Sequence, residues 1–269
     1  MAHDKNGNVN VMAGNAEGSR KEDRRKLCFE TETARDIQKH KVLNDIFIIE
    51  GIVTQGLDIL AFQKGHGKPC MALDMALCVA GNEDFMGRKT NHCKVLYFAL
   101  DDGTDGMEQK IAGIMDGSAA LGNITVVNDT SSFGNTLDDG LDIFLGSNPD
   151  IKFVVIDPLE KILENKASGQ MEYVQDYGRL SVLKKIVNNH DAALLAVTHT
   201  NEINGISGFL DGTFMESKIY DDADTIMSVF KNENQHGQEH TFFVIGRDMP
   251  ETKLSFSFNP VKYRWDYTD

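Results

Sequence analysis

The sequence predicts an α/β fold, with a mainly parallel β-sheet covered by helices on both faces and a C-terminal antiparallel extension. Two observations support this prediction. Short apolar runs alternate with helix-like segments from residue 47 to about residue 200, and strands that are apolar on both faces are typical of a covered parallel sheet. Three strand-like runs then follow one another with only turns between them, which predicts hairpins at one edge of the sheet.

The first half of the predicted sheet follows a polar N-terminal segment. Residues 1–24 carry almost no periodic apolar residue, so we expect a disordered tail there and a single domain over residues 25–269. The apolar pattern begins at Phe47. Strands are expected at 56–62, 94–100 and 124–127, and helices at 71–80, 104–115 and 137–146.

The second half contains the most strongly apolar strand of the chain, Ile151-Lys-Phe-Val-Val-Ile, which is followed by Asp157 and Pro158. A polar loop at 165–170 precedes an expected helix at 173–189 and a strand at 192–199. The three runs of the antiparallel extension are 224–230, 240–246 and 253–258.

Composition excludes several classes of protein. A formal net charge of −14 over 269 residues argues against a broad nucleic-acid surface, which needs many lysine and arginine contacts to phosphate. The basic run at 20–26 is a local candidate for such contacts, and the flank of a solvated tail is the alternative. Because no apolar run approaches the roughly 20 residues that span a bilayer, and no signal-peptide core is present, we expect a cytoplasmic protein without a membrane partner.

The cysteines form no C-x-x-C pair and lie in or beside apolar stretches. This pattern disfavours a disulfide framework or a zinc site and predicts buried free thiols. The four residues are Cys28, Cys70, Cys78 and Cys93.

Residues 58–75 resemble a phosphate-binding loop with two altered positions. They read as a strand, a glycine-containing turn, a lysine and a helix. In the pattern G-x-x-x-x-G-K-[ST], backbone N–H groups hold phosphate oxygens, the lysine reaches the terminal phosphates and the hydroxyl binds Mg²⁺. Gly67 and Lys68 match this pattern, whereas Phe62 occupies the place of the first glycine. The candidate nucleotide-binding residues are Gly65, His66, Gly67, Lys68, Pro69 and Cys70.

Pro69 occupies the place of the hydroxyl residue. Proline supplies neither a hydroxyl for the metal nor an N–H for a phosphate, so two contacts are lost together. It suits the first turn of a helix, and it disfavours a helical conformation of the preceding Lys68.

Polar residues follow the predicted parallel strands at their carboxyl ends, where ligands gather in such sheets. Asp157 and Asp102 are candidate magnesium ligands, and a carboxylate at Asp101 could polarise an attacking water. The alternative for these acids is helix capping. His199 could sense a terminal phosphate, or it could be a strand-end residue that hydrogen-bonds to the backbone.

Together, these motifs resemble the RepA-like hexameric replicative helicases and the related AAA ATPases of phages and mobile elements, which belong to the RecA-like P-loop class. The resemblance extends from about Ile46 to Trp265. It includes Gly67-Lys68, Val95-Leu-Tyr-Phe-Ala-Leu-Asp-Asp, Val155-Ile-Asp-Pro-Leu, Val197-Thr-His-Thr, Ala223-Asp-Thr, Gly246-Arg-Asp and the closing Tyr-Arg-Trp.

The resemblance implies a RecA-like fold, ATP and Mg²⁺ as ligands, a hexameric assembly, and DNA or replication proteins as partners. It implies that Lys68 contacts the β- and γ-phosphates, that Asp157 serves the metal and that His199 takes the second place of a paired-histidine sensor. Arg247 would face the nucleotide of the next subunit as an arginine finger, and an ion pair with a neighbouring acid such as Asp248 is the alternative.

The departures from the family pattern fall at positions with expected catalytic, sensor or phosphate-binding roles. Asp101 replaces a glutamate, Thr198 replaces the first histidine of the sensor, and Glu202 replaces a lysine. The segment from Gly208 to Asp222 is also longer than usual for the family. A carboxylate misplaced by about 1 Å can lose about a hundredfold in rate, so we expect weak or absent hydrolysis and a nucleotide-binding or regulatory role. A working helicase-type ATPase and a structural subunit without nucleotide remain the alternatives.

Overall fold

The structure is a computed structural model that describes residues 47–63, 71–101, 107, 110–111, 119–129, 137–163, 172–200, 222–231, 239–247, 249–259 and 264–267. These residues all lie in one compact unit, Leu43–Asp269. The expected tail, the loop at 65–70 and the segment from 208 to 221 lie outside the described residues. Of the expected helix at 104–115, the structure describes Met107, Lys110 and Ile111, all three helical.

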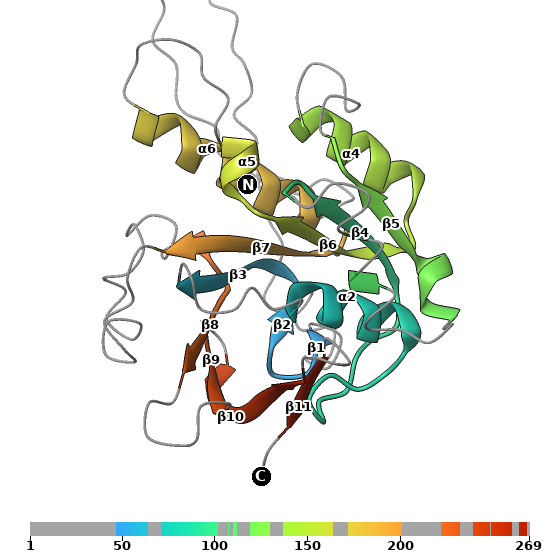
Figure 1. The fold of residues 1–269 in the computed structure, drawn as a ribbon. Helices are drawn as coiled ribbons and strands as arrows, with labels where there is room; N and C mark the ends of the chain where they lie inside the picture. The colour runs from blue at the N-terminus through green and yellow to red at the C-terminus, as the bar shows by residue number, and fades with distance from the viewer. Residues whose placement is uncertain are drawn as a thin grey trace, which may run out of the picture. The chain divides into compact units, whose positions relative to one another are not determined.

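One sheet of nine strands organises the described part of the chain, in the order β11-β10-β9-β8-β3-β7-β6-β4-β5 (Figure 1). The pairs from β8 to β5 in this order are parallel, and β9, β10 and β11 are joined by antiparallel pairs. The α/β fold with a C-terminal antiparallel extension is therefore confirmed. The strands are β3 (Gly56–Gln63), β4 (Lys94–Ala99), β5 (Ile124–Val127), β6 (Ile151–Asp157), β7 (Ala193–Thr200), β8 (Thr225–Lys231), β9 (Glu239–Gly246), β10 (Met249–Asn259) and β11 (Arg264–Tyr267).

Among its strands, the structure adds two features that the apolar pattern did not predict. A fourth C-terminal strand, β11, pairs with β10, and its four residues are too few to show a periodic pattern. A separate small sheet joins β1 (Phe47–Ile49) to β2 (Val53–Thr54). The hairpin extension starts from β8, which also pairs in parallel with β3.

Helices cover both faces of the sheet (Figure 1). One face packs against α2 (Met71–Gly81) and the small sheet, and the other against α4 (Leu137–Ser147), α5 (Glu160–Leu163) and α6 (Glu172–Asn189). Alternate residues of β6 divide between the two cores: Phe153 and Val155 face the α2 side, and Val154 and Ile156 face the α4 and α6 side. This division explains why the strand is apolar at nearly every position. A short 3₁₀ helix, η2 (Ala119–Asn123), precedes β5.

Helix α2 is buried from Met71 to Ala80, and the acid within this buried stretch has a counter-charge on the last strand. The Asp74 side chain is 4% exposed, and its Oδ1 lies 3.0 Å from Nε of Arg264 in β11. Burial raises the pKa of Asp74, while the Arg264 guanidinium opposes that rise. The short strand β11 thus provides a counter-charge to the helix that follows the predicted phosphate loop.

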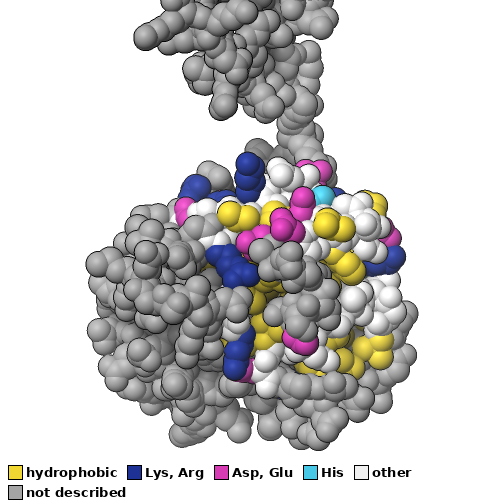
Figure 2. Space-filling view, turned by 90° about the horizontal axis from the view of Figure 1, so that it is seen from above, with side chains coloured by type: hydrophobic (Ala, Val, Ile, Leu, Met, Phe, Trp, Pro, Cys, Tyr) yellow, Lys and Arg dark blue, Asp and Glu magenta, His cyan; other side chains and the backbone are white. Residues whose placement is uncertain are grey.

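The face over α4 and α6 mixes acidic, basic and apolar side chains among its described residues (Figure 2). Ile143 of α4 and Val182 of α6 are exposed there. Scattered apolar residues of this kind are normal on a protein surface. None of the helices that the structure describes has the length and apolar character needed to span a bilayer.

Two of the four cysteines fall in the described part of the chain, and both are free thiols. Cys78 is buried in α2, and Cys93 is half-buried before β4. Burial raises the pKa of the Cys78 thiol to about 12 and that of the Cys93 thiol to about 11. These two thiols agree with the prediction of free rather than bridged cysteines.

Candidate functional site

Four parallel strands, β3, β7, β6 and β4, are neighbours in the sheet, so their carboxyl ends meet at one edge, which we call the carboxyl edge. The register pairs Phe62 with His199 and Ala99 with Asp157. The carboxyl edge therefore contains the ends of β6 and β7 and the residues that follow β4. The predicted phosphate loop also starts here, because it follows β3.

Asp157 ends β6 and is held by the neighbouring strand β4. The Tyr97 hydroxyl donates a hydrogen bond to Asp157 Oδ2 at 2.8 Å, and the Asp157 carbonyl accepts the backbone N–H of Leu100 at 2.8 Å. The first contact orients the carboxylate, and the second fixes the Asp157 backbone beside the end of β4. A single oriented carboxylate suits Mg²⁺, which is commonly bound by one or two carboxylates together with substrate phosphates and water. Asp157 therefore fits the metal that the sequence implies.

Among the described residues, no group of three or more histidine, cysteine, aspartate or glutamate side chains could hold a metal ion without help from a ligand. Asp102, the second candidate magnesium ligand, lies outside the described residues.

Asp101 follows β4 and forms an ion pair with α5. Its Oδ1 lies 3.3 Å from Nζ of Lys161, and both side chains are partly exposed, at 33% and 47%. This partner differs from the roles considered for Asp101, which were water activation and helix capping. Both of those roles stay predictions.

Glu160, which the sequence patterns did not single out, contacts the sensor position on β7. The Thr198 hydroxyl donates a hydrogen bond to Glu160 Oε1 at 2.7 Å. The backbone N–H of Leu159 donates to the Val197 carbonyl at 2.7 Å and so ties the start of α5 to β7. The one local signal was an acid three residues after Asp157, and that signal is also typical of an ordinary first turn of a helix. The His199 backbone pairs with Phe62, and its side chain is outside the described part of the structure.

Phe62 has a strand conformation at the position where the phosphate-loop pattern has its first glycine. It pairs with His199, its side chain is buried, and β3 continues to Gln63. The chain therefore does not turn at position 62. Six candidate residues, Gly65, His66, Gly67, Lys68, Pro69 and Cys70, lie outside the described residues, so their roles stay predictions.

Arg247 lies at the opposite edge of the sheet, which we call the amino edge. It follows β9, and the last residue of that strand, Gly246, pairs with Thr225 at the start of β8. The Arg247 guanidinium is half-exposed, with Nη1 3.7 Å from Asp224 Oδ1 and Nη2 donating to the Ala223 carbonyl at 3.4 Å. Its acidic partner is thus Asp224, and Asp248 lies outside the described residues. Asp101 and Asp157 do not share a site with Arg247 of the same chain.

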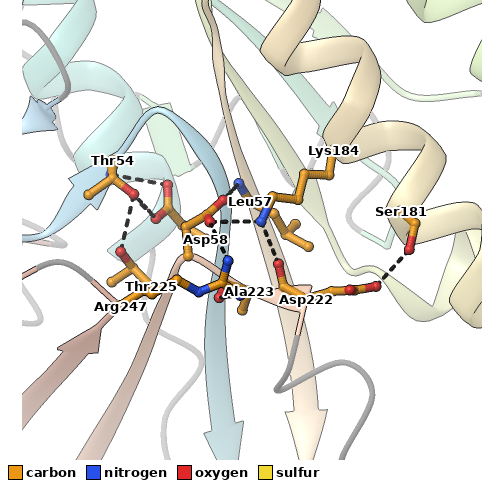
Figure 3. Close-up of polar contacts among 10 residues, drawn as sticks. Thr54, Leu57, Asp58, Ser181, Lys184, Asp222, Ala223, Thr225 and Arg247 are labelled. Carbon is orange, nitrogen blue, oxygen red and sulfur yellow. Dashed lines mark hydrogen bonds and ion pairs between the residues drawn. The ribbon is translucent and has the colours of Figure 1, made fainter. Parts of the chain in front are cut away.

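Asp224 at the amino edge contacts polar groups of Leu57 in β3, Lys184 in α6 and Arg247 after β9, and Figure 3 labels these three partners. Its carboxylate accepts the Leu57 backbone N–H at 2.9 Å and lies 2.7 Å from Nζ of Lys184 on α6. The neighbouring Asp58 of β3 is fully buried and accepts the Thr54 hydroxyl at 2.9 Å. Burial raises the pKa of Asp58 to about 8, although hydrogen bonds from Thr54 and Thr225 favour its charged form. Asp58 was not singled out from the sequence, because one acid in an apolar strand gives no pattern.

Comparisons with known proteins identify the family of this chain. A family model described as an AAA domain matches residues 22–204 of the chain. The chain belongs to this AAA domain family. No curated protein is similar in sequence.

Solved structures share the fold of this AAA domain. One solved ATPase domain matches with a TM-score of 0.59 and 16% identity, over 80% of this chain and 85% of that one. A DnaB-like replicative helicase, solved to describe its interactions with primase, matches with a TM-score of 0.57 and 16% identity, over 81% of this chain and 58% of that one. The chain thus spans little more than half of that helicase. These matches confirm the RecA-like fold that the sequence motifs indicated.

Proposed function

We propose that this AAA domain binds ATP with Mg²⁺ at the carboxyl edge, hydrolyses it slowly at most, and acts as a regulatory module in the replication or recombination of mobile DNA. One observation carries the proposal. Asp157, Asp101 and Thr198, which are far apart in the sequence, lie at the edge where the Lys68 loop leaves β3. Ligands of open parallel sheets bind at this edge.

The magnesium part of the proposal rests on Asp157. Asp157 would hold the Mg²⁺ that accompanies ATP, and the bound metal would supply positive charge against the phosphates. Tyr97 would hold the carboxylate in place through its 2.8 Å hydrogen bond. Lys68 would contact the terminal phosphates, as the loop pattern implies.

Slow hydrolysis is supported by two contacts at the same edge. The ion pair with Lys161 occupies Asp101, which is already one methylene shorter than the glutamate of the resembling family. Phe62 keeps a strand conformation where a loop glycine would let the backbone turn toward phosphate. Both features reduce the precision with which water and phosphate could be positioned.

Assembly into a ring, with six copies as the family resemblance implies, would give Arg247 a role. Arg247 lies at the amino edge, so it could reach only the nucleotide of another copy. DNA and replication proteins are the proposed partners of such a ring, because the matched helicase is a replicative one whose structure concerns primase.

Calorimetric titration with ATP and Mg²⁺ tests the proposal. We expect affinity on the order of micromolar and phosphate release far below the roughly 10 per second of a typical enzyme. Lys68→Ala should abolish the binding heat, and Lys94→Ala, a lysine paired with Asp150 away from this edge, should leave it unchanged. Absence of binding in the wild type would refute the proposal and favour a structural subunit.

A helicase-type ATPase with rapid turnover is the second candidate function. The retention of Lys68 together with a well-held Asp157 favours it. Rapid phosphate release over many turnovers, lost in Lys68→Ala, would support this candidate over the first.

A further inference from the structure

We propose that a chain of four side chains at the amino edge is a pH-sensitive switch, whose hydrogen bonds reverse direction when the buried acid at one end gains or loses a proton. The four side chains, in order along this chain, are Asp58, Thr54, Thr225 and Met249. The last of them begins β10, next to the turn that carries Arg247. This switch needs no nucleotide, so it goes beyond the proposed function and does not depend on it.

The sheet brings the two ends of the chain into one transverse row. Asp58 of β3 pairs with Thr225 of β8. Gly246 of β9 pairs with Thr225 on one side and with Met249 of β10 on the other. Residues paired in this way point to the same face of a sheet. A Cβ at Gly246 would overlap the Met249 side chain and lie 3.3 Å from the Thr225 hydroxyl oxygen, so the glycine lets the sulfur reach the hydroxyl across β9.

Three distances define the chain. Asp58 Oδ1 lies 2.9 Å from the hydroxyl oxygen of Thr54, which lies 3.2 Å from the hydroxyl oxygen of Thr225 (Figure 3). The Met249 sulfur lies 3.7 Å from the same Thr225 oxygen. Asp58, Thr54 and Thr225 are all buried, which shields their hydrogen bonds from bulk water.

The number of hydrogens decides which bonds can exist together. Each threonine hydroxyl has one hydrogen and donates to one neighbour at a time. When Asp58 is ionised, its carboxylate only accepts, and the hydroxyls of Thr54 and Thr225 both favour the charge. When Asp58 is protonated, its own O–H donates to Thr54, Thr54 donates to Thr225, and the Thr225 hydrogen is directed to Met249. Because the sulfur only accepts, the bond to Met249 belongs to the protonated state.

Burial sets the pH at which the chain reverses. Desolvation raises the pKa of Asp58 to about 8, although its hydrogen bonds oppose the rise. Charged side chains lie around it on three neighbouring elements: Asp222 and Asp224 before β8, Lys184 on α6 and Arg247 after β9. Asp224 repels a charge on Asp58 and adds to the rise, while Lys184 and Arg247 pair with Asp224 itself. Asp58 therefore holds its proton below about pH 8, and the chain reverses above that pH.

The turn between β9 and β10 is the element on which the switch acts. Met249 packs directly on Gly246, so its side chain closes this turn against β8. When Asp58 loses its proton, the Thr225 hydrogen turns toward the carboxylate, and the turn loses one of its bonds to β8. The position of Arg247, which lies between the two turn residues in sequence, thus becomes sensitive to pH.

Carbon-13 NMR of the full chain, labelled at methionine methyl groups and aspartate carboxyl groups, tests the switch from about pH 6 to about pH 10, on both sides of the pKa of about 8. In wild type, the Met249 methyl signal and the Asp58 carboxyl signal should move with the same midpoint, near pH 8. Met249→Leu and Asp58→Asn assign the two signals. Met75, which is buried in α2, is the control whose methyl signal should not follow this midpoint.

Thr225→Val and Thr225→Ser form a matched pair, because only the first removes the hydroxyl. In Thr225→Val the Met249 signal should stop following pH. The Asp58 carboxyl should still titrate there, with a higher midpoint, because a hydrogen bond that favours its charged form is lost. Thr225→Ser should keep the wild-type response of both signals. In Asp58→Asn the Met249 signal should stay constant, since no proton is gained or lost.

Any of four results would overturn the inference. In wild type these are a Met249 signal that stays constant over this pH range, or one whose midpoint differs from that of the Asp58 carboxyl. In the variants they are a Met249 signal that titrates in Asp58→Asn, or one that titrates in Thr225→Val, as it does in wild type. The wild-type comparison needs no substitution, so it decides the question even where a variant fails to fold.

Discussion

Asp101 and Lys161 form an ion pair across the carboxyl edge of the sheet, with 3.3 Å between Oδ1 and Nζ. The two residues come from different elements, since Asp101 follows β4 and Lys161 belongs to α5 after β6. The acid that the sequence motifs favour for catalysis is thus engaged by a lysine that no motif contains. The position of Asp101 in a family motif therefore does not by itself define what its side chain does in this chain.

Tyr97→Phe tests the support of Asp157. The change removes the 2.8 Å hydrogen bond to Asp157 Oδ2 and leaves the aromatic ring in the core. We expect stability to fall by about 1 kcal/mol and the Mg²⁺ concentration needed for half-maximal ATP binding to rise about tenfold, as for other residues that orient a metal ligand. Tyr267→Phe, on the exposed side chain in β11, is the control. An unchanged Mg²⁺ midpoint would argue against Asp157 as a metal ligand.

Arg264→Met tests the buried ion pair between β11 and α2. Removing the guanidinium leaves Asp74, which is 4% exposed, without its 3.0 Å partner, so the free energy of unfolding should fall by about 3 kcal/mol in urea denaturation. Adding Asp74→Leu should recover most of that loss, because no buried charge then remains at this position. Lys94→Met, which breaks an exposed pair with Asp150, should have little effect. Equal effects of the Arg264 and Lys94 changes would show that burial of Asp74 has no energetic consequence.

The pH dependence of stability should report on Asp58. Its pKa is about 8 in the folded chain against an ordinary value of 3.8, so the folded state holds a proton that the unfolded state releases between these two values. The stabilisation is complete below pH 3.8 and is lost as the pH rises toward 8.

Asp58→Asn mimics the protonated form and lacks this dependence. We expect the variant to gain about 4 kcal/mol relative to wild type between pH 5 and pH 8, since each pH unit between the two pKa values is worth about 1.4 kcal/mol, measured by urea denaturation at each pH. A difference that stays constant with pH would mean that Asp58 is ionised in the folded chain at pH 5.

Gly56→Ala tests the close contact at the amino edge. Gly56 has φ +115°, and a Cβ there would overlap Asp224 Oδ2. Strain and overlap together should cost about 3 kcal/mol in the free energy of unfolding. Gly87→Ala has a positive φ of +73° with nothing within 4 Å, so it should cost only about 1 kcal/mol. Similar losses in the free energy of unfolding at both positions would show that the loss comes from the positive φ alone and not from overlap with Asp224.

Much of the fold could be predicted from local pattern. The run Phe153-Val-Val-Ile indicated a strand covered on both faces, and its residues do alternate between the two cores. The four residues of β11 gave no such signal, because their place depends on pairing with β10 and on Arg264 reaching Asp74, 190 positions earlier.

The candidate site was predictable only where a residue follows a strand. Asp157 could be placed at the carboxyl edge because it ends an apolar run, and the structure has it there. Glu160 could not be distinguished from a first-turn acid, since its contact with Thr198 requires β6 and β7 to be neighbours. Strand order is not encoded in the spacing of apolar residues.

The sequence by itself determined the longer strands and helices, the parallel character of the central sheet and the row of polar residues at its carboxyl ends, because hydrophobic periodicity is a local property. Only the tertiary structure decided which charges meet. It paired Asp101 with Lys161, Arg264 with Asp74 and Arg247 with Asp224. Such pairs depend on the order in which strands assemble and on burial, and both arise only when distant parts of the chain pack together.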